Sequence, residues 1–331
     1  MHRGIFVSTL NADTFSNIYF TNIFFFCYNT HTMLKFSLGP KVRHPLHIHD
    51  KQLKQLEKKA SEIREDLIAM LVEAGSGHSA GPLGMADIFT ALYFHILVHD
   101  PKRPDWKDRD RLILSNGHIV PIRYATMAHA GYFPKKHLMT LRKMGSPLQG
   151  HPEHAWLPSL ETTSGPLGEG SSQAAGMAYV GLMDHSPWRV YCCMGDGELN
   201  EGQCWEAFQF AGANKLYNLT FIIDRNNIQI DGRTEEVMPL EPLDAKLEAF
   251  GLNVIKCAGN DIRDFITAVE HAHATTDKCS VIIANTIPGY GVNFMENDFL
   301  WHGKPPAKGK EAEDAIHEIR TLWGKIHSEH E

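Results

Sequence analysis

Five short apolar runs, each followed by a turn and a helix-like pattern, constrain the fold of this chain more than any other feature. The runs occupy residues 111–114, 190–194, 219–223, 254–257 and 281–284. Strands that alternate with helices are typical of a mostly parallel sheet, because a parallel strand needs a crossover connection to reach its neighbour. Strands that are apolar throughout need cover on both faces. The pattern therefore predicts the α/β class, with a mostly parallel sheet and helices on both of its faces.

Length and composition limit the other classes. The chain has 331 residues, which allows about two domains or one large α/β domain. It carries 32 Lys and Arg against 39 Asp and Glu, a net charge of −7, so it offers no basic surface for nucleic acid. The six cysteines form no C-x-x-C pair, and several lie in apolar runs. This usage indicates buried, reduced thiols and a cytoplasmic location.

Residues 1–49 differ from the rest and are interpreted as an N-terminal arm. We expect the arm to be disordered, to pack on a neighbouring subunit, or to result from a misassigned start codon, since more ordinary sequence begins at Met33. Its aromatic stretch is shorter than the ~20 residues of a membrane span, and no small-x-small cleavage pattern follows it. We therefore expect no membrane partner. The histidines at 44, 47 and 49 lack cysteine or acidic ligands at zinc spacing and are assigned to a solvated arm.

The remaining chain is predicted to form one domain, residues 50–307, whose C-terminal helix occupies 308–331. Loops rich in Gly, Pro and His interrupt the strand and helix alternation at 144–170 and 288–310. Long loops within a compact domain are usually functional, so we expect the site to use both of them.

Two helical patterns precede the first strand. Asp50 is expected to cap an amphipathic helix that closes near Gly75. Residues 85–97 are apolar nearly all round, which predicts a helix buried inside the domain or under a partner. This second helix is therefore a candidate subunit interface.

The sharpest local signal is Gly195-Asp196-Gly197, which follows an apolar run and leads into a helix. Asn226 follows the next run along the chain. If the two strands are neighbours, Asp196 and Asn226 converge beyond the carboxyl ends of the strands, where ligands of such sheets bind. A carboxylate, an amide oxygen and a backbone carbonyl form a site suited to Mg²⁺ or Ca²⁺. A metal beside a helix N-terminus implies a diphosphate ligand.

Each piece alone also has a plain structural explanation, because Asp, Asn and Gly dominate tight turns. The two pieces together, one strand apart and with matching ends, favour the metal and diphosphate interpretation. The sequence holds no G-x-x-x-x-G-K-[ST] loop and no G-x-G-x-x-G after a strand, which removes the commonest nucleotide-binding motifs.

The paired arrangement resembles the thiamine diphosphate motif, in which Asn-Asn follows Gly-Asp-Gly one strand later. Four further loops of this chain look like the signature loops of transketolase. These loops are Ser76-Gly77-His78, Ser115-Asn116-Gly117-His118, Gly150-His151-Pro152 and Gly165-Pro166-Leu167-Gly168-Glu169-Gly170. The resemblance covers roughly residues 53–302. It implies a thiamine diphosphate-binding fold that corresponds to the diphosphate-binding half of a transketolase.

The resemblance implies that His78, His151 and His302 are catalytic. His78 and His302 would reach both substrate and cofactor, and His151 would hold the sugar near the reacting carbon. Imidazole suits ketol transfer, because its pKa allows it to move protons near neutral pH.

The resemblance also implies a set of cofactor and metal ligands. The cofactor would contact His118, Gly165, Pro166, Leu167, Gly197, Asn226 and His302. The metal, Mg²⁺ or Ca²⁺, would bind Asp196, Asn226 and the carbonyl oxygen of Ile228. Glu201 would belong to a subunit-interface network near the cofactors.

Two positions depart from the transketolase pattern. Glu169 stands where the family commonly has Gln, and a negative charge close to a diphosphate is unfavourable unless it is turned away or paired. After His118, Pro121 and Arg123 stand where small or apolar residues are more usual. Neither departure removes an expected ligand.

The glutamate that activates thiamine in this family comes from a pyrimidine-binding domain of the opposing subunit, as do the residues that grip the sugar phosphate. The chain ends at Glu331, before any such domain. We therefore expect the N-terminal subunit of a split transketolase, active only with a C-terminal partner subunit in a hetero-oligomer that also self-associates. It would move a two-carbon ketol unit from a ketose phosphate to an aldose phosphate.

Two other functions stay open from the sequence. One is a related thiamine-dependent enzyme, either a deoxyxylulose-phosphate-type synthase or a 2-oxoacid dehydrogenase α-subunit, although His151 and the loop that carries His78 speak against the dehydrogenase. The other is a cofactor-binding subunit without catalysis, which the intact histidine and metal sets disfavour.

Overall fold

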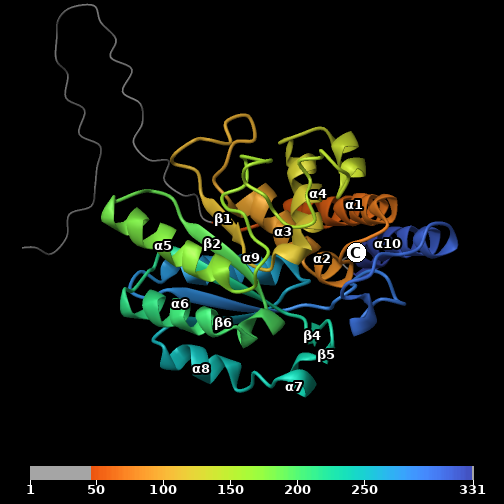
Figure 1. Ribbon diagram of the computed structural model, residues 1–331. Helices are drawn as coiled ribbons and strands as arrows, with labels where there is room; N and C mark the ends of the chain where they lie inside the picture. Colours follow the sequence, from red (N-terminus) through yellow and green to blue (C-terminus); the bar gives the residue numbers. More distant parts are fainter. Residues whose placement is uncertain (1–45, 330–331) are drawn as a thin grey trace, which may run out of the picture. The chain divides into compact units, whose positions relative to one another are not determined.

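A computed structural model of the chain describes residues 46–329, with side chains described as far as Thr321. Five strands form one sheet in the order β1-β2-β3-β7-β6, and every neighbouring pair is parallel. The strands are β1 (Arg111–Leu114), β2 (Val190–Gly195), β3 (Leu219–Arg225), β6 (Asn253–Ala258) and β7 (Ser280–Asn285). Figure 1 shows helices in front of and behind these strands. All five apolar runs are strands, so the predicted fold class is confirmed.

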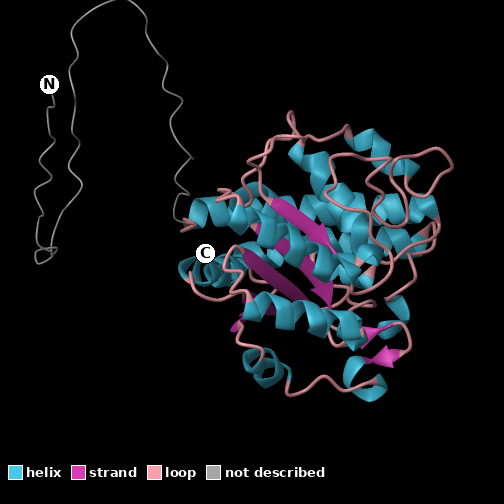
Figure 2. Ribbon diagram, turned by 60° about the vertical axis from the view of Figure 1, so that its left-hand side comes forward, coloured by secondary structure: helices cyan, strands magenta, loops and turns pink. Residues whose placement is uncertain are grey.

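The sheet separates two hydrophobic clusters, because successive side chains of a strand point to opposite faces. Cys192 belongs to the cluster on one face and its neighbour Cys193 to the cluster on the other. The first face is covered by α5 (Glu169–Met183), α6 (Gly202–Ala213) and α8 (Leu243–Ala249). The second face is covered by α9 (Ile262–Ala274), with α1 (Asp50–Ala74), α3 (Ala86–Ala91) and α4 (Val120–Ala130) packed with it. Figure 2 shows the strands with helices on both sides of them.

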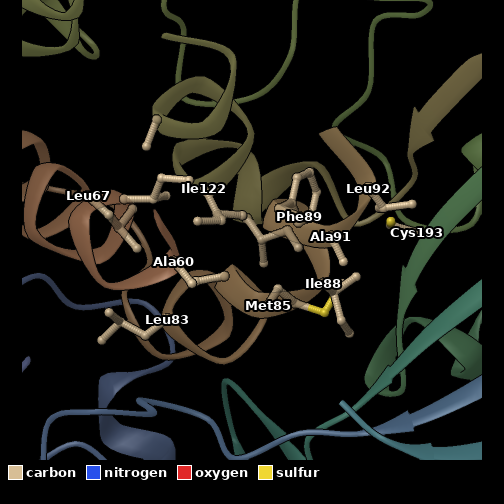
Figure 3. Packing of buried hydrophobic residues seen from close by; sticks show 14 of the residues in the cluster. Ala60, Leu67, Leu83, Met85, Ile88, Phe89, Ala91, Leu92, Ile122 and Cys193 are labelled. Atoms are coloured by element: carbon tan, nitrogen blue, oxygen red, sulfur yellow. The ribbon is translucent and has the colours of Figure 1, made fainter. Parts of the chain in front are cut away.

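The helices on the second face share one core. Figure 3 shows Leu67 of α1, Phe89 of α3 and Ile122 of α4 gathered in this cluster, and all three are fully buried. Full burial of such a side chain stabilises the fold by about 1.5 to 3 kcal/mol. The apolar segment 85–97 forms α3 and the π-helical turn Leu92–Ile96. Because α3 is buried within the chain, the expectation that this segment is a subunit interface is wrong.

The ends of α1 follow local rules. The helix begins at Asp50 and its capping residue is His49, so the prediction that Asp50 caps it is wrong by one residue. It closes at Gly75, whose φ of 65° places it in the left-handed region and whose N–H donates to the Leu71 carbonyl oxygen. α10 (Lys310–Glu329) packs on α1, where a C-terminal helix was expected.

Short elements complete the described chain. They are α2 (Ala80–Gly84), the 3-10 turns Gly117–Ile119, Lys135–Thr140, Gly197–Asn200 and Phe299–Trp301, the hairpin β4 (Ile228–Gln229) and β5 (Gly232–Arg233), and α7 (Thr234–Val237). The described residues belong to one compact unit, and the predicted arm lies outside them apart from 46–49.

Two further predictions concern the cysteines and the absence of a membrane span. Cys192, Cys193, Cys204, Cys257 and Cys279 are buried and free, as expected, while Cys27 lies outside the described residues. Within residues 46–329, no helix combines the length and the apolar composition that crossing a membrane requires.

Candidate functional site

The candidate site lies beyond the carboxyl ends of the central strands. β2 and β3 are neighbours, with Gly195 paired to Asp224, so the turns that follow the two strands leave the sheet side by side. A cavity of about 270 Å³ opens there. It is lined by His78, Asn116, His118, His151, Gly165, Leu167, Gly195, Asp196, Gly197, Glu198, Asp224, Asn226, Ile228, Gln229, Ile230 and His302.

The Asp196 carboxylate holds the two strand ends together. It is 1% exposed, and its Oδ1 accepts a hydrogen bond from the Gly197 N–H at 2.7 Å. Its Oδ2 accepts from Arg225 at 2.9 Å and from the Asn227 N–H at 2.7 Å. Burial raises the pKa of Asp196, and the adjacent Arg225 opposes that shift. Oδ1, with a single donor, keeps a lone pair available for a further ligand.

Asp224 orients the Asn226 side chain. Its Oδ2 accepts from the Asn226 amide nitrogen at 2.8 Å, and its Oδ1 accepts from the Thr286 hydroxyl. The Asn226 Oδ1 then accepts from the Ile228 N–H at 3.0 Å. Burial raises the pKa of Asp224 to about 7, and the charge of Asp196 adds to the shift. The orientation of the Asn226 side-chain amide is therefore fixed, and its Oδ1 keeps one lone pair for a further ligand.

Three of the four expected histidines form a compact group. The ring centroids of His78 and His118 are 4.8 Å apart, those of His78 and His302 are 5.5 Å apart, and those of His118 and His302 are 5.2 Å apart. His151 lines the same cavity from another loop, beside Gly165. The fold therefore gathers four histidines from four separate segments at one cavity.

All four imidazoles favour the neutral form. Burial lowers the pKa of His78 to about 4, and His302, Arg142 and His151 add to the shift. Burial is also the largest cause of the lowered pKa of His118, His151 and His302. A neutral imidazole has one nitrogen that donates a hydrogen bond and one that accepts, so each ring can take up a proton from a ligand hydroxyl and then return it.

Glu198 ties the strand ends to the start of α5. Its side chain is buried, and Oε1 accepts from the Ser115 hydroxyl and from the Gly168 N–H at 2.6 Å. Oε2 accepts from the Gly195 N–H at 3.0 Å. Burial raises the pKa of Glu198, which these three donors oppose.

Two glycines allow backbones to approach closely. A Cβ on Gly117 would lie 2.6 Å from the Ser164 hydroxyl oxygen, and one on Gly170 would lie 2.6 Å from the Ser115 Cα. The Gly117 approach brings the segment of His118 against the loop of Gly165. A side chain at either glycine would push these segments apart.

The cavity brings together nearly all of the site residues that the sequence predicts. All of the expected catalytic and ligand residues line it except Pro166, which is exposed between Gly165 and Leu167. Glu169 is exposed at the start of α5, and Arg123 is buried in α4. Sequence reasoning assigned no role to Asn116, Glu198 and Asp224, although each lies at the end of a strand or in the turn after it.

Several buried polar atoms around the cavity lack protein partners. Within the described part of the chain, the Asn116 amide, His78 Nδ1, His302 Nδ1 and Gln229 Nε2 have no hydrogen-bond partner. Buried polar groups normally have one, so these atoms fit a polar ligand in the cavity. Among the side chains that the structure describes, no group of three or more His, Cys, Asp or Glu is placed to hold a metal.

This geometry defines an α/β protein with a polar ligand cavity at the strand ends of a parallel sheet. Residues 56–330 match the family model described as transketolase, thiamine diphosphate binding domain. The chain belongs to the transketolase family and corresponds to its thiamine diphosphate-binding part.

Similar proteins include short chains named as subunits. The chain is 42% identical over 247 residues to the 6-deoxy-6-sulfo-D-fructose transketolase subunit SqwG of a Clostridium species. The aligned region covers 75% of this chain and 90% of that subunit. It is 40% identical over 267 residues to an apulose-4-phosphate transketolase subunit from Actinobacillus succinogenes. That alignment covers 80% of this chain and 96% of the subunit.

Solved structures show the same fold within longer chains. Transketolase from Campylobacter jejuni has a TM-score of 0.74 and 33% identity, over 84% of this chain and 43% of that one. Transketolase from Pichia stipitis in complex with sedoheptulose-7-phosphate has a TM-score of 0.75 and 31% identity, over 82% of this chain and 41% of that one. The chain therefore spans about two fifths of these transketolases.

Proposed function

We propose that this chain is the N-terminal, cofactor-binding subunit of a two-chain transketolase. The complete enzyme would transfer a two-carbon ketol unit from a ketose phosphate to an aldose phosphate. The observation that carries the proposal is the group of neutral histidines beside Asp196 and Asn226 in one cavity. Similarity to chains named as transketolase subunits, over nearly their whole length, supports it.

The histidines would manage the protons of the reaction. Thiamine diphosphate supplies the carbon that holds the two-carbon unit during transfer. As the donor bond breaks, a donor hydroxyl loses a proton, and as the new bond forms, the acceptor carbonyl oxygen gains one. His78 and His302, both neutral, would exchange these protons with the sugar. His151 would hold the sugar, and His118 would contact the diphosphate.

The turns beyond β2 and β3 would hold the diphosphate and a divalent cation. Asp196, Asn226 and the carbonyl oxygen of Ile228 would bind Mg²⁺ or Ca²⁺, which prefer such oxygen ligands. The free lone pairs on Asp196 and Asn226 support this assignment. Gly197 would allow the diphosphate to approach the backbone, and Gly165, Pro166 and Leu167 would contact the rest of the cofactor.

A C-terminal transketolase subunit would dock on α5 and α6. Tyr179, Val180, Met183 and Phe210 form what we term the docking face, and their exposed fractions are 40%, 50%, 64% and 42%. The Tyr179 and Phe210 rings are 5.6 Å apart, so the face is continuous between the two helices. Proteins named as transketolase subunits match this chain over 90% and 96% of their own length, which supports a second chain as the occupant.

The chemical proposal is tested by purifying the chain with and without a C-terminal transketolase subunit of the same organism. Ketol transfer from several ketose phosphates should require both chains, Mg²⁺ and thiamine diphosphate. Robust transfer by this chain alone would overturn the two-chain proposal. Cofactor binding without transfer by the pair would favour a non-catalytic subunit.

The sugars stay open, because the similar subunits are named for different ones, apulose-4-phosphate and 6-deoxy-6-sulfo-D-fructose. Self-association and the cytoplasmic location remain predictions, and the five buried free cysteines support the location.

A further inference from the structure

A buried network of charged side chains joins two of the segments that line the cavity. Arg123 of α4 is 1% exposed, and its Nη2 donates to one oxygen of the Glu161 carboxylate. Arg109 Nη1 donates to the other oxygen at 2.7 Å. Arg123 Nε also donates to the Tyr93 hydroxyl at 3.2 Å. Two guanidinium groups therefore share one carboxylate in the interior of the protein.

Burying the Arg123 guanidinium group costs folding free energy. Burying a charge is unfavourable unless it is paired and hydrogen-bonded, and Nη1 of Arg123 has no hydrogen-bond partner in the described part of the chain. An apolar side chain at 123 would fill the core without that cost. What the arginine adds is a directional, charge-assisted bond to Glu161.

The two ends of this bond lie close to residues of the cavity. Arg123 follows His118 by little more than one helical turn, and Glu161 shortly precedes Gly165. The chain from 151 to 168 contains no helix or strand, so its shape depends on individual contacts. Two of these are the bond from the Ser164 N–H to the Pro152 carbonyl oxygen, 3.0 Å, and that between His154 Nδ1 and the Leu160 carbonyl oxygen, 2.6 Å. Both close the loop on itself, whereas Glu161 joins it to α4.

We propose that Arg123 is a positioning residue which, through Glu161, holds the 151–168 loop against α4. The contact keeps His151 and Gly165 at the cavity and so sets the affinity for thiamine diphosphate. This inference rests on the proposed function in that it names the cofactor. Its first consequence, the order of the loop, is measurable without any cofactor.

The experiment compares the full-length chain with Arg123→Met and Arg123→Lys. Hydrogen exchange of the cofactor-free proteins should be faster at 151–168 in Arg123→Met than in the wild type. Affinity for thiamine diphosphate with Mg²⁺, measured by calorimetry, should fall by about tenfold. Arg123→Lys keeps the charge and should recover part of both changes.

Arg64→Met is the matched control, because Arg64 is equally buried, pairs with Asp87 and does not line the cavity. It should lower the melting temperature without faster exchange at 151–168. If Arg123→Met behaves like this control, with unchanged loop exchange and affinity, Arg123 is only structural and the inference is overturned.

If Arg123→Met does not fold, Glu161→Gln removes the shared charge with little change of shape and is judged by the same criteria. Failure of the wild type to bind thiamine diphosphate, alone and with the partner subunit, would overturn the proposed function. The exchange measurement would still decide whether Arg123 holds the loop.

Discussion

The Ser79 hydroxyl donates a hydrogen bond to the carbonyl oxygen of Trp301, 3.1 Å away. The same hydroxyl lies 2.6 Å from the Lys304 carbonyl oxygen, so its single proton is shared between two acceptors. The neighbours of the bonded residues are His78 and His302. This contact therefore joins the first and last histidine-bearing segments of the cavity.

Replacing Ser79 by Ala should loosen the histidine group. The buried carbonyl oxygens lose their donor, which costs about 1 to 3 kcal/mol of folding stability. We expect a lower melting temperature and a several-fold weaker affinity for thiamine diphosphate with Mg²⁺. Thr126→Val is the control, because its buried hydroxyl bonds only the Ile122 carbonyl oxygen within α4. Equal effects of the two variants on cofactor affinity would contradict the prediction.

Acid should destabilise the cofactor-free protein through His78. Its pKa is about 4 in the folded protein and 6.5 as the unperturbed value, so between these pH values the unfolded state binds more protons. The contribution of His78 to stability is complete above pH 6.5 and is lost as the pH falls toward 4. Urea denaturation at pH 7 and pH 5 should show a smaller acid loss for His78→Asn than for the wild type. An identical loss would show that His78 does not carry this dependence.

Asp196→Ala should abolish metal-dependent cofactor binding. The variant removes one proposed cation ligand, and titration of Mg²⁺ in the presence of thiamine diphosphate measures the result. It also removes the acceptor of Arg225 Nη1, so Arg225→Met is needed to separate the two effects. Asp244→Ala, which breaks an exposed ion pair with Lys256, should bind normally. Unchanged affinity in Asp196→Ala would return Gly195-Asp196-Gly197 to the role of a simple turn.

Glu198→Gln should disturb the cavity from inside. The new amide cannot accept hydrogen bonds at both ends, so one of the Gly168 and Gly195 N–H groups loses its acceptor. We expect a loss of about 1 to 3 kcal/mol in unfolding free energy. Cofactor affinity should fall as well, because the lost bond tethers a cavity segment. Chemical denaturation and calorimetry would measure the two effects, and normal values for both would exclude a tethering role.

Val180→Glu should weaken binding of the C-terminal subunit by at least about tenfold, because a charge on the docking face must be desolvated on binding. Co-purification and sedimentation of the mixed subunits would measure this. Met238→Glu places the same charge on another exposed apolar residue and should bind normally. If both variants bind normally, the partner docks elsewhere. If Val180→Glu changes only the oligomeric state of this chain alone, a second copy occupies the face.

Sequence reasoning found the strand-end part of the site because its logic is local. Asp196 and Asn226 each follow an apolar strand, and parallel neighbours carry such residues to one edge. The histidine group is different: His78 and His302 meet through contacts such as that of Ser79, which no spacing encodes. Only the resemblance to transketolases assigned them to one cavity.

The misplaced interface has a similar physical cause. A helix that is apolar all round is buried, but the pattern does not distinguish burial in its own core from burial under a partner. The docking face proposed above has a sequence signal in α5, because residues 170–183 contain no charged residue although part of that helix is exposed. Glu198 and Asp224 were missed because a lone acidic residue at a strand end has no distinguishing pattern.

Helix α5 begins directly after the cavity-lining loop of Gly165 and Leu167 and carries Tyr179, Val180 and Met183 toward its other end. A single rigid rod therefore spans the proposed cofactor site and the proposed partner site. Thermodynamic reciprocity then applies to the two binding events: by whatever factor the cofactor strengthens assembly of the two chains, assembly must strengthen cofactor binding. Where that factor exceeds one, a shortage of thiamine diphosphate lowers the number of assembled enzymes as well as the number of loaded ones.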